Sequence, residues 1–264
     1  MSATTATLSP SGNVGVLRNT LTIARRNLLH IKANPEQLVE MSIQPLMFLV
    51  LFVYVFGGSI AGSSRDYLQF ALPGILVQGI AFTPFTTAIG LNVDFQRGLV
   101  DRFRSLPIAR SAVIGGRIAA DSVRIAWSAF IMTFFGVLLG FRFDGGAAGA
   151  LGAYLLVIAF GLTMCWPMAF IGITARTTES VNTWGFMIIL PLSFASSAFV
   201  DPSTMPGWLE AFAEVNPITS VIDATRGLML GGPVADPVVR SVLWLAAIQA
   251  LFVPLTIARY RRRV

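Results

Sequence analysis

The chain has 264 residues, of which 55% are hydrophobic and only 12% are charged, and its mean hydropathy is +0.71. Soluble domains contain about 25% charged residues, so this composition excludes an ordinary soluble globular protein. The single cysteine, Cys165, excludes an intrachain disulfide and a cysteine metal cluster, and no other metal site is predicted.

Long apolar stretches without a charged residue recur along the chain. A membrane-spanning helix needs about 20 mainly apolar residues, and these stretches do not alternate apolar and polar residues as barrel strands do. We therefore predict an all-α integral membrane protein with six transmembrane helices. The six stretches are 41–64, 67–93, 125–141, 145–175, 180–200 and 241–258.

The N-terminal region precedes the first of these stretches. Residues 1–16 are small and polar, which predicts a disordered cytoplasmic tail. In 17–34, apolar residues recur at helical spacing and basic residues border them, which predicts an amphipathic helix lying in the cytoplasmic headgroup layer. The six-span domain is assigned to 35–258, and a basic tail to 259–264.

The basic residues are distributed unevenly between alternate segments of this topology, with 15 on one side and 4 on the other. Lys and Arg are retained on the cytoplasmic side. Both termini and the loop 92–124 are therefore predicted to be cytoplasmic. The net charge of +6 then reflects topology and not an affinity for nucleic acid.

The cytoplasmic loop 92–124 contains an apolar ridge between charged residues. Leu99, Phe103 and Leu106 follow a spacing of four and three, which predicts a short helix that docks into a groove on a soluble partner. The predicted partner-coupling residues are Leu99, Asp101, Arg102, Phe103, Arg104, Leu106 and Pro107.

The last loop, 201–240, is external in this topology and longer than a turn requires. Segments 206–215 and 218–230 are helical in pattern, and Asn216-Pro217 separates them. We predict two short half-helices that re-enter the outer leaflet. The residues singled out in this re-entrant segment are Trp208, Asn216, Pro217 and Arg226.

The sequence lacks residues that ATP binding, catalysis within the membrane and ion coupling usually require. The only lysine, Lys32, does not follow a Gly-rich loop, so the chain has no P-loop for ATP. The only histidine, His30, lies in the amphipathic helix, which disfavours a membrane enzyme, and no catalytic residue is predicted. The six apolar stretches contain no ionisable side chain for ion coupling, although backbone carbonyls at broken helices leave an ion-coupled carrier open.

Two segments carry a family resemblance. Residues 98–110, GLVDRFRSLPIAR, resemble the coupling-helix region of ABC-2 type permeases, in particular the daunorubicin/doxorubicin-resistance exporters of actinobacteria. Segments 216–219 and 224–228, with Gly231-Gly232, are similar to the segment before the last span of that family. The resemblance implies a half-transporter in which two membrane subunits, with spans one and five at the seam, bind two separate ATPase subunits. ATP and Mg belong to those subunits, and this chain holds no cofactor.

The function expected from this resemblance is that of the permease subunit of an exporter for an amphipathic drug-like or lipid-like compound. Export of a lipid-linked glycan or cell-wall lipid is an alternative within the same mechanism, and an ATP-independent carrier or channel is an alternative of another class. Membrane lipid and a second membrane subunit, a copy of this chain or a paralogue, are the other expected partners. The predicted substrate-path residues are Gln78, Phe82, Thr83, Phe85, Asn182, Phe186 and Phe194.

Overall fold

The computed structural model describes residues 35–97 and 110–263. The predicted N-terminal tail and amphipathic helix lie outside the described residues. So do all seven predicted partner-coupling residues, because they fall within 98–109.

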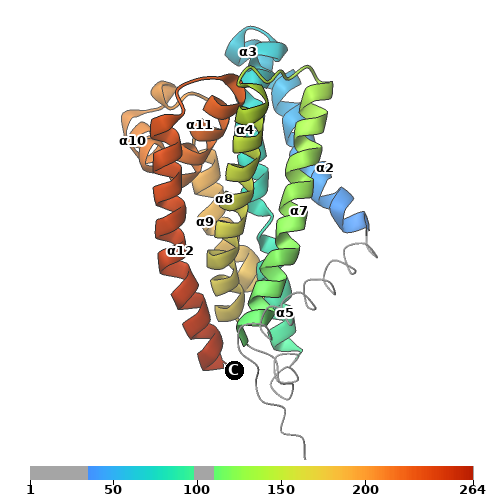
Figure 1. Cartoon of the computed structure of the whole chain (residues 1–264), viewed down its shortest axis with the longest axis vertical. Coiled ribbons are helices and arrows are strands. Elements are labelled where there is room, and N and C mark those ends of the chain that lie inside the picture. Colours follow the sequence, from blue (N-terminus) through green and yellow to red (C-terminus); the bar gives the residue numbers. More distant parts are fainter. Residues whose placement is uncertain (1–34, 98–109, 264) are drawn as a thin grey trace, which may run out of the picture.

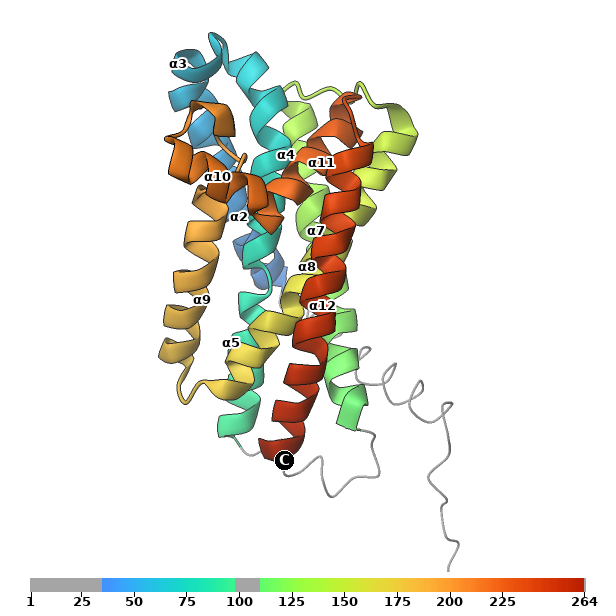
Figure 2. The same cartoon turned by 90° about the vertical axis from the view of Figure 1, so that its left-hand side faces the viewer.

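The described residues form helices joined by short turns, and they contain no strand (Figures 1 and 2). This confirms the all-α prediction. The elements are α2 (Pro35–Leu51), a π-helical turn η1 (Phe52–Phe56), α3 (Gly57–Ala61), α4 (Ser64–Phe82), α5 (Phe85–Gln96), α7 (Arg110–Leu138), α8 (Gly146–Thr174), α9 (Thr178–Phe194), a 3-10 turn η2 (Pro202–Thr204), α10 (Gly207–Val215), α11 (Pro217–Leu230) and α12 (Ala235–Arg263).

Among the residues that the structure describes, five helical segments are long and apolar enough to cross a membrane. They correspond to five of the six predicted stretches, and α4 and α5 together make the second. The stretch at 180–200 forms α9, which has 17 residues and runs along the bundle from the α8–α9 turn to the region of α10 (Figure 2). The five segments are Ile43–Ile60, Ser64–Gln96, Asp121–Leu138, Gly146–Thr174 and Ala235–Arg263.

The two ends of the bundle differ in charge. One end, called here the basic end, holds the C-termini of α5 and α12 and the α8–α9 turn (Figure 2). The opposite end, called the acidic end, holds α3, the α7–α8 turn and α10. The basic end has Arg97, Arg176, Arg261, Arg262 and Arg263 beside two acids, Asp94 and Glu179. The acidic end has Asp66, Asp144, Asp201, Glu210, Glu214, Asp223 and Asp236 beside four arginines, Arg65, Arg142, Arg226 and Arg240.

The two helices predicted in the loop 201–240 are both present, but they differ in burial. Helix α11 packs on α4, α8 and α12, and most of its side chains are buried. Helix α10 lies at the margin of the bundle, with Trp208 75% and Val215 65% exposed. Only α11 therefore penetrates the bundle.

Glycines allow α11 to approach α8 closely. Gly145 and Gly149, spaced one helical turn apart, face the carbonyl oxygen of Leu228, and a methyl group at either position would overlap that oxygen. Gly136 of α7 packs instead against the side chain of Leu72 in α4. Gly140 follows the end of α7 with a φ of 107°, which L side chains rarely adopt, so there the glycine permits a chain reversal.

Helix α7 is longer than the third apolar stretch and carries a buried carboxylate just before it. The stretch begins at Ile125, but the helix continues without a break from Arg110, and its segment that is long and apolar enough to cross a membrane begins at Asp121. Asp121 is only 1% exposed.

Candidate functional site

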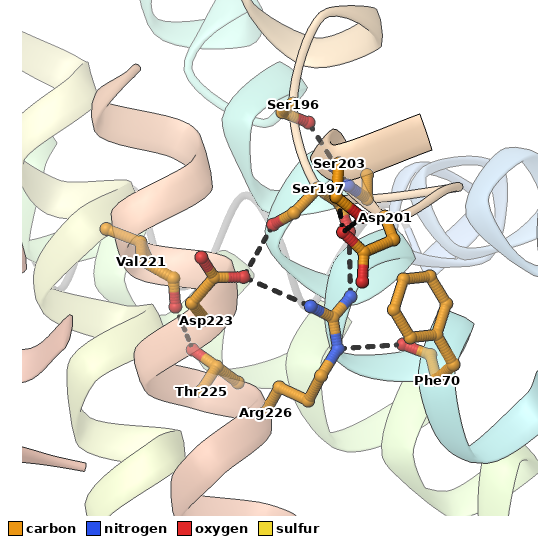
Figure 3. Close-up of polar contacts among 10 residues, drawn as sticks. Phe70, Ser196, Ser197, Asp201, Ser203, Val221, Asp223, Thr225 and Arg226 are labelled. Atoms are coloured by element: carbon orange, nitrogen blue, oxygen red, sulfur yellow. Dashed lines mark hydrogen bonds and ion pairs between the residues drawn. The ribbon is translucent and has the colours of Figure 1, made fainter. Parts of the chain in front are cut away.

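At the acidic end, Arg226 of α11 joins three parts of the chain (Figure 3). Its Nε donates to the carbonyl oxygen of Phe70 in α4 at 3.2 Å, and its Nη2 donates to the carbonyl oxygen of Ser197 at 2.7 Å. Its guanidinium carbon lies 4.0 Å from the centroid of the Phe70 ring, within the range of a cation–π interaction. The planar guanidinium thus fixes α11 against α4 and the segment after α9.

Two carboxylates accompany this arginine. Asp223 accepts hydrogen bonds from Nη1 of Arg226 at 3.1 Å and from Oγ of Ser197 at 2.6 Å. Asp201 accepts from the backbone N–H and the hydroxyl of Ser203, and these bonds hold the pKa of the Asp201 carboxyl below its ordinary value. Asp201 is therefore charged at neutral pH, beside a cluster in which the arginine is already paired.

Asn216 connects α9 to α11. Its amide Nδ2 donates to the carbonyl oxygens of Leu192 and Ala195 at 2.7 and 2.8 Å, and these carbonyls belong to the last turn and C-cap of α9. Its Oδ1 accepts from the backbone N–H of Ile218 at 2.9 Å, which caps the N-terminus of α11. One buried amide therefore satisfies groups at two helix ends.

At the basic end, Asn92 of α5 makes the corresponding contact with α8. Its Nδ2 donates to the carbonyl oxygens of Gly172 and Ala175 at 3.0 and 2.9 Å, and Asn92 is 1% exposed. Gln96 donates to Oδ1 of Asn92 at 2.8 Å and to the carbonyl oxygen of Arg176 at 3.2 Å. We call Asn92 and Gln96 the α5 clamp.

The start of α5 is attached to α7. Thr87 Oγ1 donates to Oδ2 of Asp121 at 2.5 Å, and Nη1 of Arg124 donates to Oδ1 of Asp121 at 2.7 Å. Both oxygens of this buried carboxylate are therefore paired, as a buried charge requires. No sequence pattern marked Thr87 or Asn92, and the charge pattern placed Asp121 in the predicted cytoplasmic loop 92–124.

The predicted substrate-path residues form one cluster and several separate sites. Phe82, Phe85 and Phe186 lie together where α4 gives way to α5, with ring centroids 4.8 to 6.1 Å apart. Phe194 is apart from them and stacks on Phe199 at 5.4 Å.

The polar residues of the predicted path are next to this cluster in the sequence. Thr83 bonds to the carbonyl of Gly79 in its own helix, Gln78 is buried, and Asn182 is half-buried on α9. The contacts that the structure shows among the predicted path residues are those of the three aromatic rings.

The residues predicted in the re-entrant segment also have distinct positions. Asn216 and Arg226 are central to the contacts at the acidic end, and Pro217 is the first residue of α11. Trp208 lies on the exposed face of α10 and makes none of these contacts.

Packed apolar helices with charges at two opposite ends define a multi-pass membrane protein. The family model of the ABC-2 type transporter matches residues 18–230, and the chain therefore belongs to this family.

Curated relatives cover most of the chain. The daunorubicin resistance ABC transporter permease protein DrrB1 of Streptomyces coeruleorubidus is 39% identical over 244 residues, which are 92% of this chain and 86% of that protein. The probable doxorubicin resistance ABC transporter permease protein DrrC of Mycobacterium tuberculosis is 29% identical over 221 residues, 83% of this chain and 79% of that protein. The inner membrane transport permease YadH of Escherichia coli is 20% identical over 201 residues, 73% of this chain and 77% of that protein.

Proposed function

We propose that this chain is the membrane-spanning permease subunit of an exporter that moves an amphipathic drug-like or lipid-like compound out of the cell. The observation that carries the proposal is its 39% identity, over 92% of the chain, to a daunorubicin resistance permease. The energy comes from ATP hydrolysed with Mg by a separate subunit, since this chain has no P-loop.

The proposed topology has six spans with both termini in the cytoplasm of a bacterial cell. Helix α9 is the fifth span in chain order, in addition to the five longer segments: its 17 residues are at the lower limit for crossing the hydrocarbon layer. The concentration of arginines at the basic end supports a cytoplasmic position for that end.

The ATPase subunit is proposed to dock on residues 98–109, which connect α5 to α7 in the sequence. Leu99, Phe103 and Leu106 supply the apolar contact, and burial of one such side chain stabilises a complex by about 1.5–3 kcal/mol. Two ATPase subunits and a second membrane subunit, a copy of this chain or a paralogue, complete the transporter.

The proposed cargo passes the aromatic cluster of Phe82, Phe85 and Phe186. Phe186 is 43% exposed while Phe85 is buried, so the cluster extends from the interior of the bundle to its surface. Such a surface suits a compound with a large apolar part.

Reconstitution tests the proposal. The chain is purified with and without a co-expressed ATPase subunit and placed in liposomes, and uptake of daunorubicin and of a fluorescent lipid is measured with ATP and with vanadate. We expect vanadate-sensitive transport only with the ATPase subunit. Transport by the chain alone would instead support the ATP-independent carrier, for which the buried Asp121 supplies an ionisable group.

The docking residues are tested in the same system. Phe103→Ala with Arg104→Ala should reduce retention of the ATPase subunit in pull-down and its cargo-stimulated hydrolysis. Arg262→Ala, which removes another arginine at the basic end, is the matched control and should change neither. Wild-type retention and hydrolysis in the double variant would exclude 98–109 as the docking site.

The orientation is tested by thiol labelling of intact cells. Cysteines placed at Gly58 and Gly232, both exposed at the acidic end, should react with an impermeant reagent. A cysteine at Leu99 should not. Labelling at Leu99 from outside would reverse the topology.

A further inference from the structure

Helix α5 is a separate rigid piece within the second span. Helix α4 ends at Phe82, and α5 begins at Phe85. Pro84 lies between them and has no backbone N–H to continue the helical hydrogen bonds. The break therefore permits α5 to rotate relative to α4.

Near this break, α5 is attached to α7 through Thr87 and Asp121. Further along, it is attached to α8 through the α5 clamp, with Asn92 five and Gln96 nine residues beyond Thr87. A helix of 12 residues is about 18 Å long, so a rotation of 10° about the break displaces Gln96 at its far end by about 3 Å and Asn92 by about 2 Å. The contact with α7 lies close to the pivot and moves less than either residue of the clamp.

The α5 clamp binds α8 through backbone carbonyl oxygens and not through side chains of α8. Gly172, Ala175 and Arg176 contribute carbonyl oxygens at the end of α8, where carbonyls have no partner within the helix. A displacement of about 2 Å at Asn92 and about 3 Å at Gln96 would break these hydrogen bonds, and the loss is costly at the buried Asn92. A moving α5 therefore carries the end of α8 with it while the clamp is closed.

Close packing at the same level strengthens this attachment. Gly172 faces the backbone of Ala88, so that α5 and α8 touch without an intervening side chain. The chain then leaves α8 through Arg176 and enters α9 at Thr178. Helix α9 begins directly after the turn at Arg176 and Thr177, and it carries Phe186 of the aromatic cluster.

We propose that Asn92 is a positioning residue that transmits displacement of α5 to the α8–α9 turn, with the break at Pro84 as the pivot and the clamp closed throughout the cycle. This inference rests on the proposed function, in which the ATPase subunit acts on the residues that follow α5. Asn92 then determines how much transport each hydrolysed ATP produces, and not whether ATP is hydrolysed.

The test compares transport and hydrolysis in liposomes holding the complex with its ATPase subunit. Asn92→Leu keeps the side-chain size and removes both donors. We expect hydrolysis near the wild-type rate and transport per ATP reduced about five-fold, within the range of measured coupling effects. Thr256→Val is the matched control, because it removes one hydrogen bond between α12 and the carbonyl of Trp166 in α8, and it should leave the ratio unchanged.

In a second experiment, a disulfide between two introduced cysteines joins α5 to the α8–α9 turn in place of the α5 clamp. Gln96→Cys and Arg176→Cys are introduced in a Cys165→Ala background, since Gln96 and Arg176 are both exposed and in contact. In the Asn92→Leu protein, oxidation should restore transport per ATP and reduction should abolish the restoration. If Asn92→Leu does not assemble, the cysteine pair with Asn92 intact decides the question: oxidised complex that still transports supports a closed clamp.

Two results would overturn the inference. One is an unchanged ratio of transport to hydrolysis in assembled Asn92→Leu complex. The other is loss of transport on oxidation of the cysteine pair with Asn92 intact, since the clamp would then have to open. Absence of ATP-dependent transport in the wild-type complex would contradict the proposed function itself, before any variant is considered.

Discussion

Asn92 and Asn216 make the same contact at opposite ends of the bundle. Each amide donates to two carbonyl oxygens in the last turn of a neighbouring helix, α8 for Asn92 and α9 for Asn216. Helix C-termini leave carbonyl groups without partners, and inside an apolar bundle water is not present to satisfy them. A side-chain amide supplies the missing donors in both places.

The surroundings of the two asparagines differ. Asn216 also caps α11, and Arg226 of the same helix is bonded to α4 and to the segment after α9. The acidic end is thus held by several linked contacts. Asn92 lies within a short helix that follows a break, and Gln96 is the polar side chain that extends its contact. The acidic end is held by a larger set of linked contacts, whereas at the basic end the contact of Asn92 belongs to a short helix that begins after the break at Pro84.

The largest loss of stability is expected for Arg226→Leu. The change removes three hydrogen bonds, so that the carbonyls of Phe70 and Ser197 lose this donor and Asp223 loses its cationic partner while keeping the bond from Ser197, which costs about 3 kcal/mol. The melting temperature in detergent measures it. Arg226→Lys should be intermediate, because an ammonium group does not reproduce the planar fork. A melting temperature equal to that of wild type would mean that the acidic end is not fixed by this residue.

Asn216→Ala should be the next most harmful change. It removes the cap of α11, worth about 1 kcal/mol, and leaves the carbonyls of Leu192 and Ala195 unsatisfied, for a total of about 2–3 kcal/mol. Asn216→Asp retains the oxygen that accepts from the N–H of Ile218 but loses the amide N–H groups that donate to Leu192 and Ala195. Its melting temperature should lie between those of Asn216→Ala and wild type, and equality with wild type would show that capping of α9 contributes nothing.

Variants of Asp121 and Arg124 test whether these two side chains form an ion pair that stabilises the fold. Asp121→Leu leaves Arg124 half-buried without its partner and should cost about 2 kcal/mol, whereas Asp121→Leu with Arg124→Leu should cost less than about 1 kcal/mol. Thermal unfolding of the single and double variants measures this difference. Additive losses in the double variant would indicate that the two side chains act independently.

The smallest effect is expected for Arg240→Ala. Arg240 pairs with Asp236 at 3.0 Å, but the two side chains are 59% and 70% exposed. Exposed pairs of this kind contribute about 0–0.5 kcal/mol. The change in melting temperature should therefore be close to zero. A loss comparable to that of Arg226→Leu would mean that charge alone, and not burial of the arginine, stabilises the acidic end.

Much of the fold could be predicted from residues close together in the sequence. Apolar stretches predicted the long helices, and Asn216-Pro217 predicted the boundary between α10 and α11, which the structure places at those residues. The charge count predicted which segments share an end of the bundle. The partner-coupling role of Leu99, Phe103 and their neighbours, which lie outside the described residues, stays a prediction.

The site could be predicted less well, for a physical reason. Asp121 was missed because a rule based on uncharged windows ends a span at the first charge, although a helix can bury a carboxylate whose two oxygens are paired. Asn92 was missed because its partners are backbone carbonyls 80 and 83 residues away, which no local pattern marks.

By itself, the sequence determined the class of protein, the helical segments and the distribution of charge between the two ends, because hydropathy and helical periodicity depend on neighbouring residues. Only the tertiary structure decided which polar side chains meet. Packing sets the rotation of each helix about its axis and its position along the bundle. The close contacts of Gly172 with the backbone of Ala88 and of Gly145 with the backbone of Leu228 are examples. That register brings Asn92 to the end of α8, Asn216 to the end of α9 and Arg226 to Phe70.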